Sequence, residues 1–153
     1  MEPENYQLDN LDRQILNALL RDARTPFTEI AEKENVSSGT IHVRIDKLKQ
    51  AGVIKGTKLL VDHSALGYGV SAYLGINLHN ARDYKMVLEK LRQVDGILEA
   101  YYTTGEFNIF TKIITKSIPD LYRFLVELQQ VQEIQTTQTT MILESPILRD
   151  IEL

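Results

Sequence analysis

The sequence predicts an α+β protein in two parts, a winged helix-turn-helix over residues 1–62 and a ferredoxin-like βαββαβ domain over residues 63–153. The first part holds three segments with apolar residues at helical spacing. In the second part, strands of alternating polarity are interspersed with two amphipathic helices. The stretch "HSALGYG" between them has two glycines and no strong periodicity, which indicates a joint.

Composition excludes several classes of protein. The chain has no cysteine, so disulfides, thiolate metal sites and a cysteine nucleophile are excluded. No apolar run approaches the ~20 residues that span a bilayer. The acidic, polar start "MEPENYQLDN" predicts no secretory signal. We therefore expect a cytoplasmic protein with no membrane partner.

Two helices are predicted before residue 36. In "LDNLDRQILNALLRDA", Asp9 is the expected N-cap of a helix with a broad apolar stripe. In "RTPFTEIAEKENV", we expect Thr25 to cap the helix and Pro26 to take its first position. Asn35 then suits a left-handed turn. The spacing fits a helix-turn-helix unit, although any compact three-helix bundle would share this pattern.

The third predicted helix, "SGTIHVRIDKLKQ", is basic on an acidic chain. Ser37 or Ser38 caps it, and Ile41, Ile45 and Leu48 form its core face. Residues 36–60 carry five bases and one acid, whereas the whole chain has a formal net charge of -4. A local basic patch indicates a polyanion partner, and the alternative is a merely solvated helix face.

The polar face of this helix predicts contacts with double-stranded DNA. Arg44 and Lys47 would supply charge, and the exposed Val43 would contact a thymine methyl or, alternatively, another domain. The segment "VIKGTKLLV" that follows is expected to form a strand pair or wing. The candidate DNA-binding residues are Ser38, Gly39, Thr40, His42, Val43, Arg44 and Lys47.

The second part predicts an antiparallel sheet with both helices on one face. Its strands are expected at "VSAYLGINL", "GILEAYYTTG", "FNIFTKIITK" and "EIQTTQTTMIL", and its helices at "ARDYKMVLEKLRQV" and "SIPDLYRFLVELQQV". The face without helices carries Tyr73 and threonines, so we expect a second copy to cover it in a homo-oligomer.

The corner "EAYYTTGEFN" is a candidate site for a small polar ligand. Backbone N–H groups at such a turn can form a nest for a carboxylate, and Glu106 can pair with a ligand ammonium or face solvent. An ordinary hairpin is the alternative. The residues chosen for ligand contact are Tyr102, Thr104, Gly105 and Asn108.

Together, "LDNLDRQILNALLRDARTPFTEIAE", "VSSGTIHVRIDKLKQAGVI" and "EAYYTTGEFNIF" resemble the Lrp/AsnC family of transcription regulators. The resemblance covers nearly the whole chain in the right order. It implies a regulation of amino-acid metabolism (RAM, ACT-like) domain after the DNA-binding part. It also implies dimers that assemble into octamers, wrap DNA and bind amino acids between dimers. The phrases "GTIHVR", "KQAGVI", "LGYGV" and "AYYTTG" are most similar to the asparagine-responsive members.

The resemblance assigns roles to individual residues. Residues 38–50 become the recognition helix, and Tyr102–Gly105 with Asn108 become the effector motif. A neighbouring dimer would contribute polar groups at Gln129, Thr137 and Thr139. The family often carries Asp or Ser where this chain has Asn108, which affects the expected amino-acid preference. The resemblance further implies an L-asparagine effector, no other cofactor, no metal, and a bacterial, nucleoid-associated location.

Three rival functions remain open at this stage. An enzyme is disfavoured, because His42, His63 and His79 lie in separate segments and no catalytic order or phosphate loop stands out. An architectural protein that bends DNA without an effector would need the same phosphate contacts. A sensor of another amino acid, such as leucine or methionine, would keep the same fold.

Overall fold

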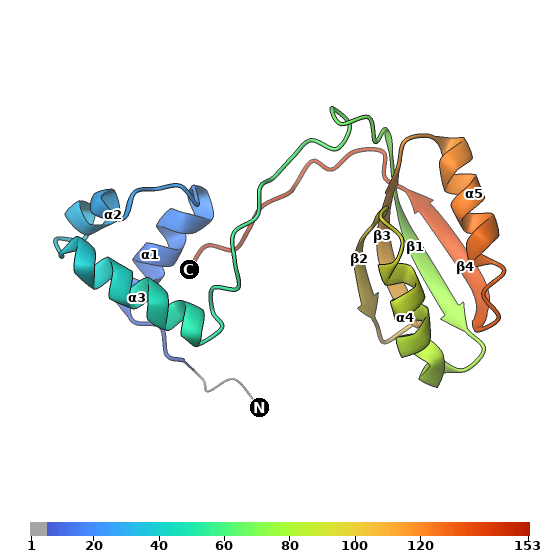
Figure 1. Cartoon of the computed structure of the whole chain (residues 1–153), viewed down its shortest axis with the longest axis horizontal. Coiled ribbons are helices and arrows are strands. Elements are labelled where there is room, and N and C mark those ends of the chain that lie inside the picture. The colour runs from blue at the N-terminus through green and yellow to red at the C-terminus, as the bar shows by residue number, and fades with distance from the viewer. Residues whose placement is uncertain (1–5) are drawn as a thin grey trace. The chain divides into compact units, whose positions relative to one another are not determined.

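The computed structural model describes residues 6–153 and divides the chain into two compact units (Figure 1). One unit, called here the helical unit, runs to Leu60 and also includes Ile147–Leu153. The other, the sheet unit, is Val61–Pro146. The helical unit contains α1 (Asn10–Arg21), α2 (Phe27–Lys33) and α3 (Ser38–Gln50).

The helix starts follow from capping side chains, with one correction. Asp9 caps α1 in a capping box with Asp12, and Ser37 caps α3, as predicted. For α2 the prediction is one residue early, because Pro26 occupies the N-cap position. The Thr25 hydroxyl instead donates to the carbonyl of Asp22 at 2.7 Å, so it does not cap α2.

The three helices share one apolar core. Ile15, Ile30 and Ala31 pack with Ile41 and Ile45, which confirms the predicted core face of the third helix. The turn before α3 contains Asn35 at φ 54°, the left-handed conformation expected there. The start of α3 is therefore set by this turn and the Ser37 cap, and its direction is set by the shared core.

Of the two alternatives expected after α3, a strand pair or a wing, the strand pair is wrong. Residues 51–69 contain no strand. The N–H groups of Val53 and Ile54 donate to the Leu48 carbonyl, which ends the helix rather than starting a strand. Leu59 and Leu60 are 81% and 83% exposed, so no neighbouring strand covers them.

The last seven residues belong to the helical unit, whereas the sequence alone placed them in the second domain. The side-chain amide of Asn17 exchanges two hydrogen bonds with the backbone of Leu153, at 2.8 and 2.9 Å. Arg21 pairs with Glu152 at 2.9 Å. The partners are 136 and 131 residues apart in the sequence, so no local pattern could have indicated this contact.

The sheet unit has the predicted βαββαβ order. Its elements are β1 (Val70–Leu78), the short helix η1 (Ala81–Asp83), α4 (Tyr84–Arg92), β2 (Ile97–Tyr102), β3 (Ile109–Thr115), α5 (Ile118–Leu128) and β4 (Ile134–Met141). The strands are antiparallel in the order β2-β3-β1-β4. Ser117 caps α5, as expected.

Both long helices cover the same face of this sheet (Figure 1). Leu74 and Ile76 of β1 pack there with Val87 of α4 and Leu128 of α5. Since side chains alternate along a strand, Tyr73 and its cross-strand neighbours lie on the opposite face. We call this second surface the open face; it is defined by Tyr73, Tyr101, Phe107, Phe110 and Lys112.

Candidate nucleic-acid interface and effector site

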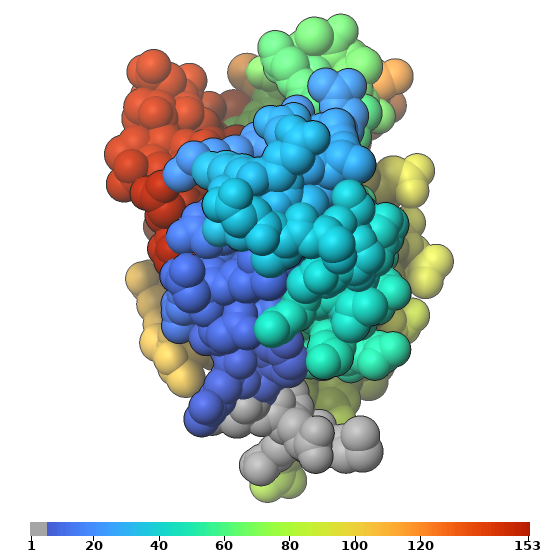
Figure 2. All heavy atoms as spheres, turned by 90° about the vertical axis from the view of Figure 1, so that its left-hand side faces the viewer, coloured from blue at the N-terminus to red at the C-terminus, as the bar shows by residue number. Residues whose placement is uncertain are grey.

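The outward side of α3 carries most of the candidate DNA-binding residues. Gly39, His42, Val43 and Lys47 are exposed, whereas Ser38 and Thr40 are half-buried. Val43 is 55% exposed, so this apolar side chain lies among the exposed residues of the helix rather than in its core face. In Figure 2 residues 38–50, coloured cyan to teal, form a broad surface beside α1 in blue.

Local contacts fix two of these side chains. The Thr40 and Ser37 hydroxyls lie 2.9 Å apart within hydrogen-bonding distance. The His42 ring meets the Phe27 ring edge-on, with centroids 4.8 Å apart. These contacts hold the start of α3 in a defined orientation while leaving the ring edge of His42 and the Lys47 ammonium accessible.

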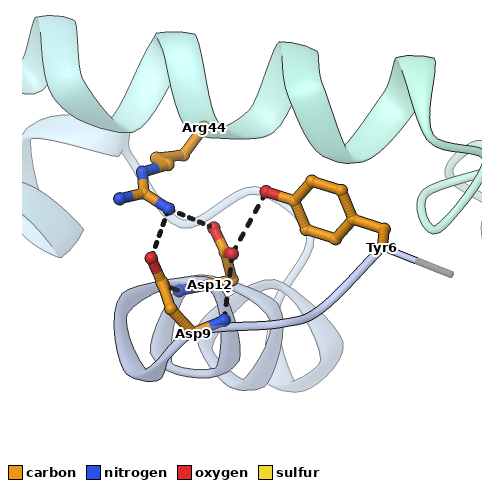
Figure 3. A network of polar contacts seen from close by, with 4 residues as sticks. All are labelled: Tyr6, Asp9, Asp12 and Arg44. Carbon is orange, nitrogen blue, oxygen red and sulfur yellow. Dashed lines mark hydrogen bonds and ion pairs between the residues drawn. The ribbon is translucent and has the colours of Figure 1, made fainter.

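Arg44 differs from the other candidates on α3. Its guanidinium turns to the start of α1, where Nη1 donates to Asp9 Oδ2 at 2.5 Å and Asp12 Oδ1 at 3.3 Å (Figure 3). The Tyr6 hydroxyl also donates to Asp12, at 3.2 Å. The structure therefore gives Arg44 a role inside the helical unit that was not foreseen from sequence.

In the sheet unit, the turn between β2 and β3 has an ordered frame. Thr103 N–H donates to the Asn108 carbonyl, and Asn108 N–H donates to the Ile76 carbonyl, both at 3.0 Å. The Asn108 side chain accepts from Leu78 N–H at 2.9 Å. Asn108 thus braces the turn against β1, and its amide oxygen is already engaged.

The tip of this turn is open. Thr104, Gly105 and Glu106 are exposed, and Gly105 has a φ of 106° that favours glycine. Within residues 6–153, the backbone N–H groups of these three residues make no hydrogen bond to the protein. Three successive free donors next to a carboxylate are suited to an α-amino acid, whose two charged ends have opposite sign.

Phe107 anchors the turn to the open face. Its ring lies over Gly75 of β1, so that a Cβ at Gly75 would sit 2.6 Å from ring atoms. Phe107 also stacks near Phe110, which in turn stacks on Tyr73, with centroids 6.2 and 5.3 Å apart. The turn between β2 and β3 and the aromatic surface of the sheet are therefore in direct contact.

The remaining effector candidates lie outside the tip of this turn, and Tyr102 ends the strand that leads into it. Tyr102 points to the helix side and stacks on Tyr84 of α4 with centroids 4.0 Å apart. Gln129 is the exposed C-cap of α5, and Thr137 and Thr139 lie on β4. Thr137 is paired with Ile76 of β1, whose carbonyl accepts from Asn108 N–H, so a single strand lies between Thr137 and the turn.

Sequence reasoning missed Asp9 and Asp12 as partners of Arg44, and it missed Phe107. The pairing of Arg44 with Asp9 spans 35 residues, so only the packed helices reveal it. The one available signal was Asp12, a charged residue three positions after an N-cap and within an apolar stripe. For Phe107 the signal was Gly75, a glycine inside an otherwise apolar strand, which indicates a close approach.

Among residues 6–153, no cluster of three or more His, Asp or Glu side chains is placed to hold a metal ion. No helix in the same range is long and apolar enough to cross a membrane.

Comparison with known proteins defines the class. A family model described as "Winged helix-turn-helix DNA-binding" matches residues 8–55, and one described as "Lrp/AsnC ligand binding domain" matches residues 71–151. The first match falls within the helical unit, and the second covers most of the sheet unit and extends into residues 147–151. The fold and its two parts thus define a transcriptional regulator that has a DNA-binding unit and a ligand-binding unit.

Individual relatives narrow the assignment. The chain is 47% identical to "Regulatory protein AsnC" of Haemophilus influenzae, over 96% of this chain and 99% of the relative. It is 48% identical to the protein of the same name in Escherichia coli K12, over 97% and 99%. The solved structure of E. coli AsnC superposes with a TM-score of 0.91 at 46% identity, covering 97% of this chain and 100% of that one. This chain therefore belongs to the Lrp/AsnC family.

Proposed function

We propose that this regulator controls amino-acid metabolism, that its effector is L-asparagine, and that the effector modulates DNA binding or assembly. The proposal of an L-asparagine effector rests on the 47–48% identity to relatives named AsnC, together with the open turn at 104–106. We place the protein in the bacterial cytoplasm, bound to the nucleoid.

The proposed DNA contacts lie on the outward face of α3. Lys47 and the hydroxyls of Ser38 and Thr40 contact phosphates, Val43 packs on a thymine methyl, and Gly39 allows close approach of the helix start. His42 donates to a base edge or a phosphate. In a dimer, two such helices enter successive major grooves about 34–36 Å apart, on a pseudo-palindromic site.

The proposed effector site uses the two ends of the amino acid. Its carboxylate accepts hydrogen bonds from the N–H groups of Thr104 and Gly105, and its ammonium pairs with Glu106. Tyr102 and Asn108 frame the turn. The side-chain amide of asparagine binds polar groups from another copy, and the candidates are Gln129, Thr137 and Thr139.

A second copy also explains the open face. Tyr73 and Tyr101 are 37% and 54% exposed there, beside the stacked Phe107 and Phe110. Aromatic side chains in contact with each other favour burial in a sheet-to-sheet dimer. We propose this homodimer as the basic unit and an octamer as its assembly. Replacing Tyr73 by Glu should give monomers in sedimentation velocity, whereas Tyr73→Phe should leave the dimer intact.

A thermal-shift panel of the twenty amino acids tests the effector. A ligand that binds only the folded state stabilises it by about 2.7 kcal/mol at one hundred times Kd. We expect asparagine to give the largest shift, and we expect Glu106→Gln to reduce it. Glu144→Gln, which also neutralises an exposed carboxylate, is the matched control and should leave the shift unchanged.

Each other outcome of the panel changes the proposal in a defined way. A larger shift with leucine or methionine would keep the mechanism and replace the effector. No shift up to millimolar concentrations would favour an effector-independent protein that bends DNA, since that function needs only the α3 surface and its phosphate contacts.

A further inference from the structure

Arg44 lies on the recognition helix, but its surroundings differ from those of a DNA-contacting arginine. The same nitrogen, Nη1, donates to a carboxylate of Asp9 and to one of Asp12 (Figure 3). The Arg44 side chain is 30% exposed, whereas the neighbouring Lys47 is exposed to solvent. Two carboxylates against one guanidinium make this corner unfavourable for a phosphate.

Asp12 explains why the cation is needed here. The residue has 0% exposure, and its carboxylate accepts from Asp9 N–H, the Tyr6 hydroxyl and Arg44. A buried carboxylate is costly unless it is paired and hydrogen-bonded. Arg44 is the cation within reach, and it comes from a different helix.

Asp9 completes the connection between the helices. Its Oδ1 accepts from Asp12 N–H at 2.9 Å as the cap of α1, while its Oδ2 accepts from Arg44. The N–H of Asp12 and then the guanidinium hold the pKa of Asp9 below its ordinary range. In turn the Asp9 carboxylate raises the pKa of Arg44. One side chain thus links the start of α1 to the middle of α3.

We propose that Arg44 is a positioning residue, which fixes the orientation of the recognition helix on α1 through Asp9 and Asp12 and contacts no phosphate. The proposal rests on the DNA-binding role of α3. Between α1 and α3 the apolar core sets the distance, but apolar packing is non-directional. The charge-assisted bonds add the direction, since a planar guanidinium on fixed carboxylates constrains rotation of α3 about its axis.

The test separates positioning from direct contact through salt dependence. The probe is a 30-base-pair duplex selected from a random pool with the wild-type protein, compared with calf-thymus DNA. Loss of one phosphate contact lowers the slope of log K against log salt by about 0.9. Lys47→Met should lower the slope by about this amount for each contact. Arg44→Met should leave the slope unchanged and weaken binding to the selected duplex roughly ten-fold, with calf-thymus binding unchanged.

A second pair of variants guards against misfolding of Arg44→Met. Asp9→Asn keeps a good helix cap but loses the charge that holds Arg44. If Arg44 is a positioning residue, Asp9→Asn should weaken binding to the selected duplex. The double variant Asp9→Asn/Arg44→Met should then bind no more weakly than Arg44→Met alone. Direct contact predicts tighter binding, because Arg44 is freed and a negative charge is removed.

The outcomes have distinct meanings. A reduced salt slope for Arg44→Met, or tighter binding by Asp9→Asn, overturns the positioning role. An unchanged slope and unchanged affinity for Lys47→Met would instead contradict the DNA surface of α3, on which the proposal depends.

Discussion

The helical unit and the sheet unit hold their candidate sites in different ways. On α3 the residues at positions 39, 42, 43 and 47 are all exposed and belong to a single helix. In the sheet unit, the turn at 103–108 follows β2 and is bonded to β1, whereas Thr137 and Thr139 lie on the neighbouring strand β4. The candidate DNA-contacting residues thus lie on one helix, whereas the candidate effector residues are spread over a turn, the end of α5 and β4.

The largest expected effects test whether the two units are stabilised separately. Leu48→Ala and Leu74→Ala each delete a side chain with 0% exposure from one unit, at an expected cost of about 2–5 kcal/mol. Hydrogen exchange should show lost protection mainly in the unit that carries the substitution. Equal loss of protection in both units for either variant would show that they unfold as one.

Gly75→Ala tests the link between the open face and the effector turn. A Cβ would sit 2.6 Å from the Phe107 ring and displace it, with an expected cost of about 1–3 kcal/mol from overpacking. We expect the asparagine-induced thermal shift to shrink as the turn moves. Gly69→Ala is the control, since its nearest contact is 3.7 Å and its φ is ordinary. Equal behaviour of the two variants would remove Phe107 from the account.

Asn108 offers a smaller and more selective change. Asn108→Ala leaves Leu78 N–H without its side-chain acceptor, which should cost about 1 kcal/mol in urea unfolding and loosen the turn. Asn108→Asp keeps an acceptor and should stay close to the wild type in stability. If Asn108→Ala and Asn108→Asp were equally stable, the hydrogen bond between the Asn108 side chain and Leu78 N–H would contribute little.

The smallest expected effect is a pH dependence of the helical unit. The pKa of Asp9 is lowered from its ordinary 3.8, first by the Asp12 N–H and also by Arg44. A depressed pKa adds stability that is present above the unfolded value and lost as pH falls through the folded one. Below pH 3.8 the wild type should therefore lose more stability than Asp9→Asn. The measurement is the midpoint of unfolding as a function of pH, followed by circular dichroism. Parallel curves for both proteins would contradict the pairing.

Sequence patterns predicted the fold where the signals are local. The Ser37 cap, the face of Ile41 and Ile45, and the alternation of β1 are each contained within one element. Patterns failed where the outcome depends on tertiary contacts. Residues 53–61 form no strand pair, and Leu59 and Leu60 stay exposed; Pro26 occupies the N-cap position of α2 that was expected for Thr25.

The candidate sites divide in the same way. The exposed polar face of α3 follows from helical periodicity, since Ile41 and Ile45 fix which side is buried. The engagement of Arg44 by Asp9 and the contact of Phe107 with Gly75 require packing between distant segments. A single sequence carries no direct signal for such pairs, so Arg44 was singled out without its partners and Phe107 was not singled out at all.

The most direct test of the account is the affinity for the selected duplex with and without L-asparagine, measured by fluorescence anisotropy at fixed salt. Coupling between an effector and a second ligand is typically about 5–150-fold in affinity. The account predicts a change in Kd of at least about five-fold that Glu106→Gln diminishes and Glu144→Gln does not. An unchanged Kd at saturating asparagine, with the same assembly size, would contradict it.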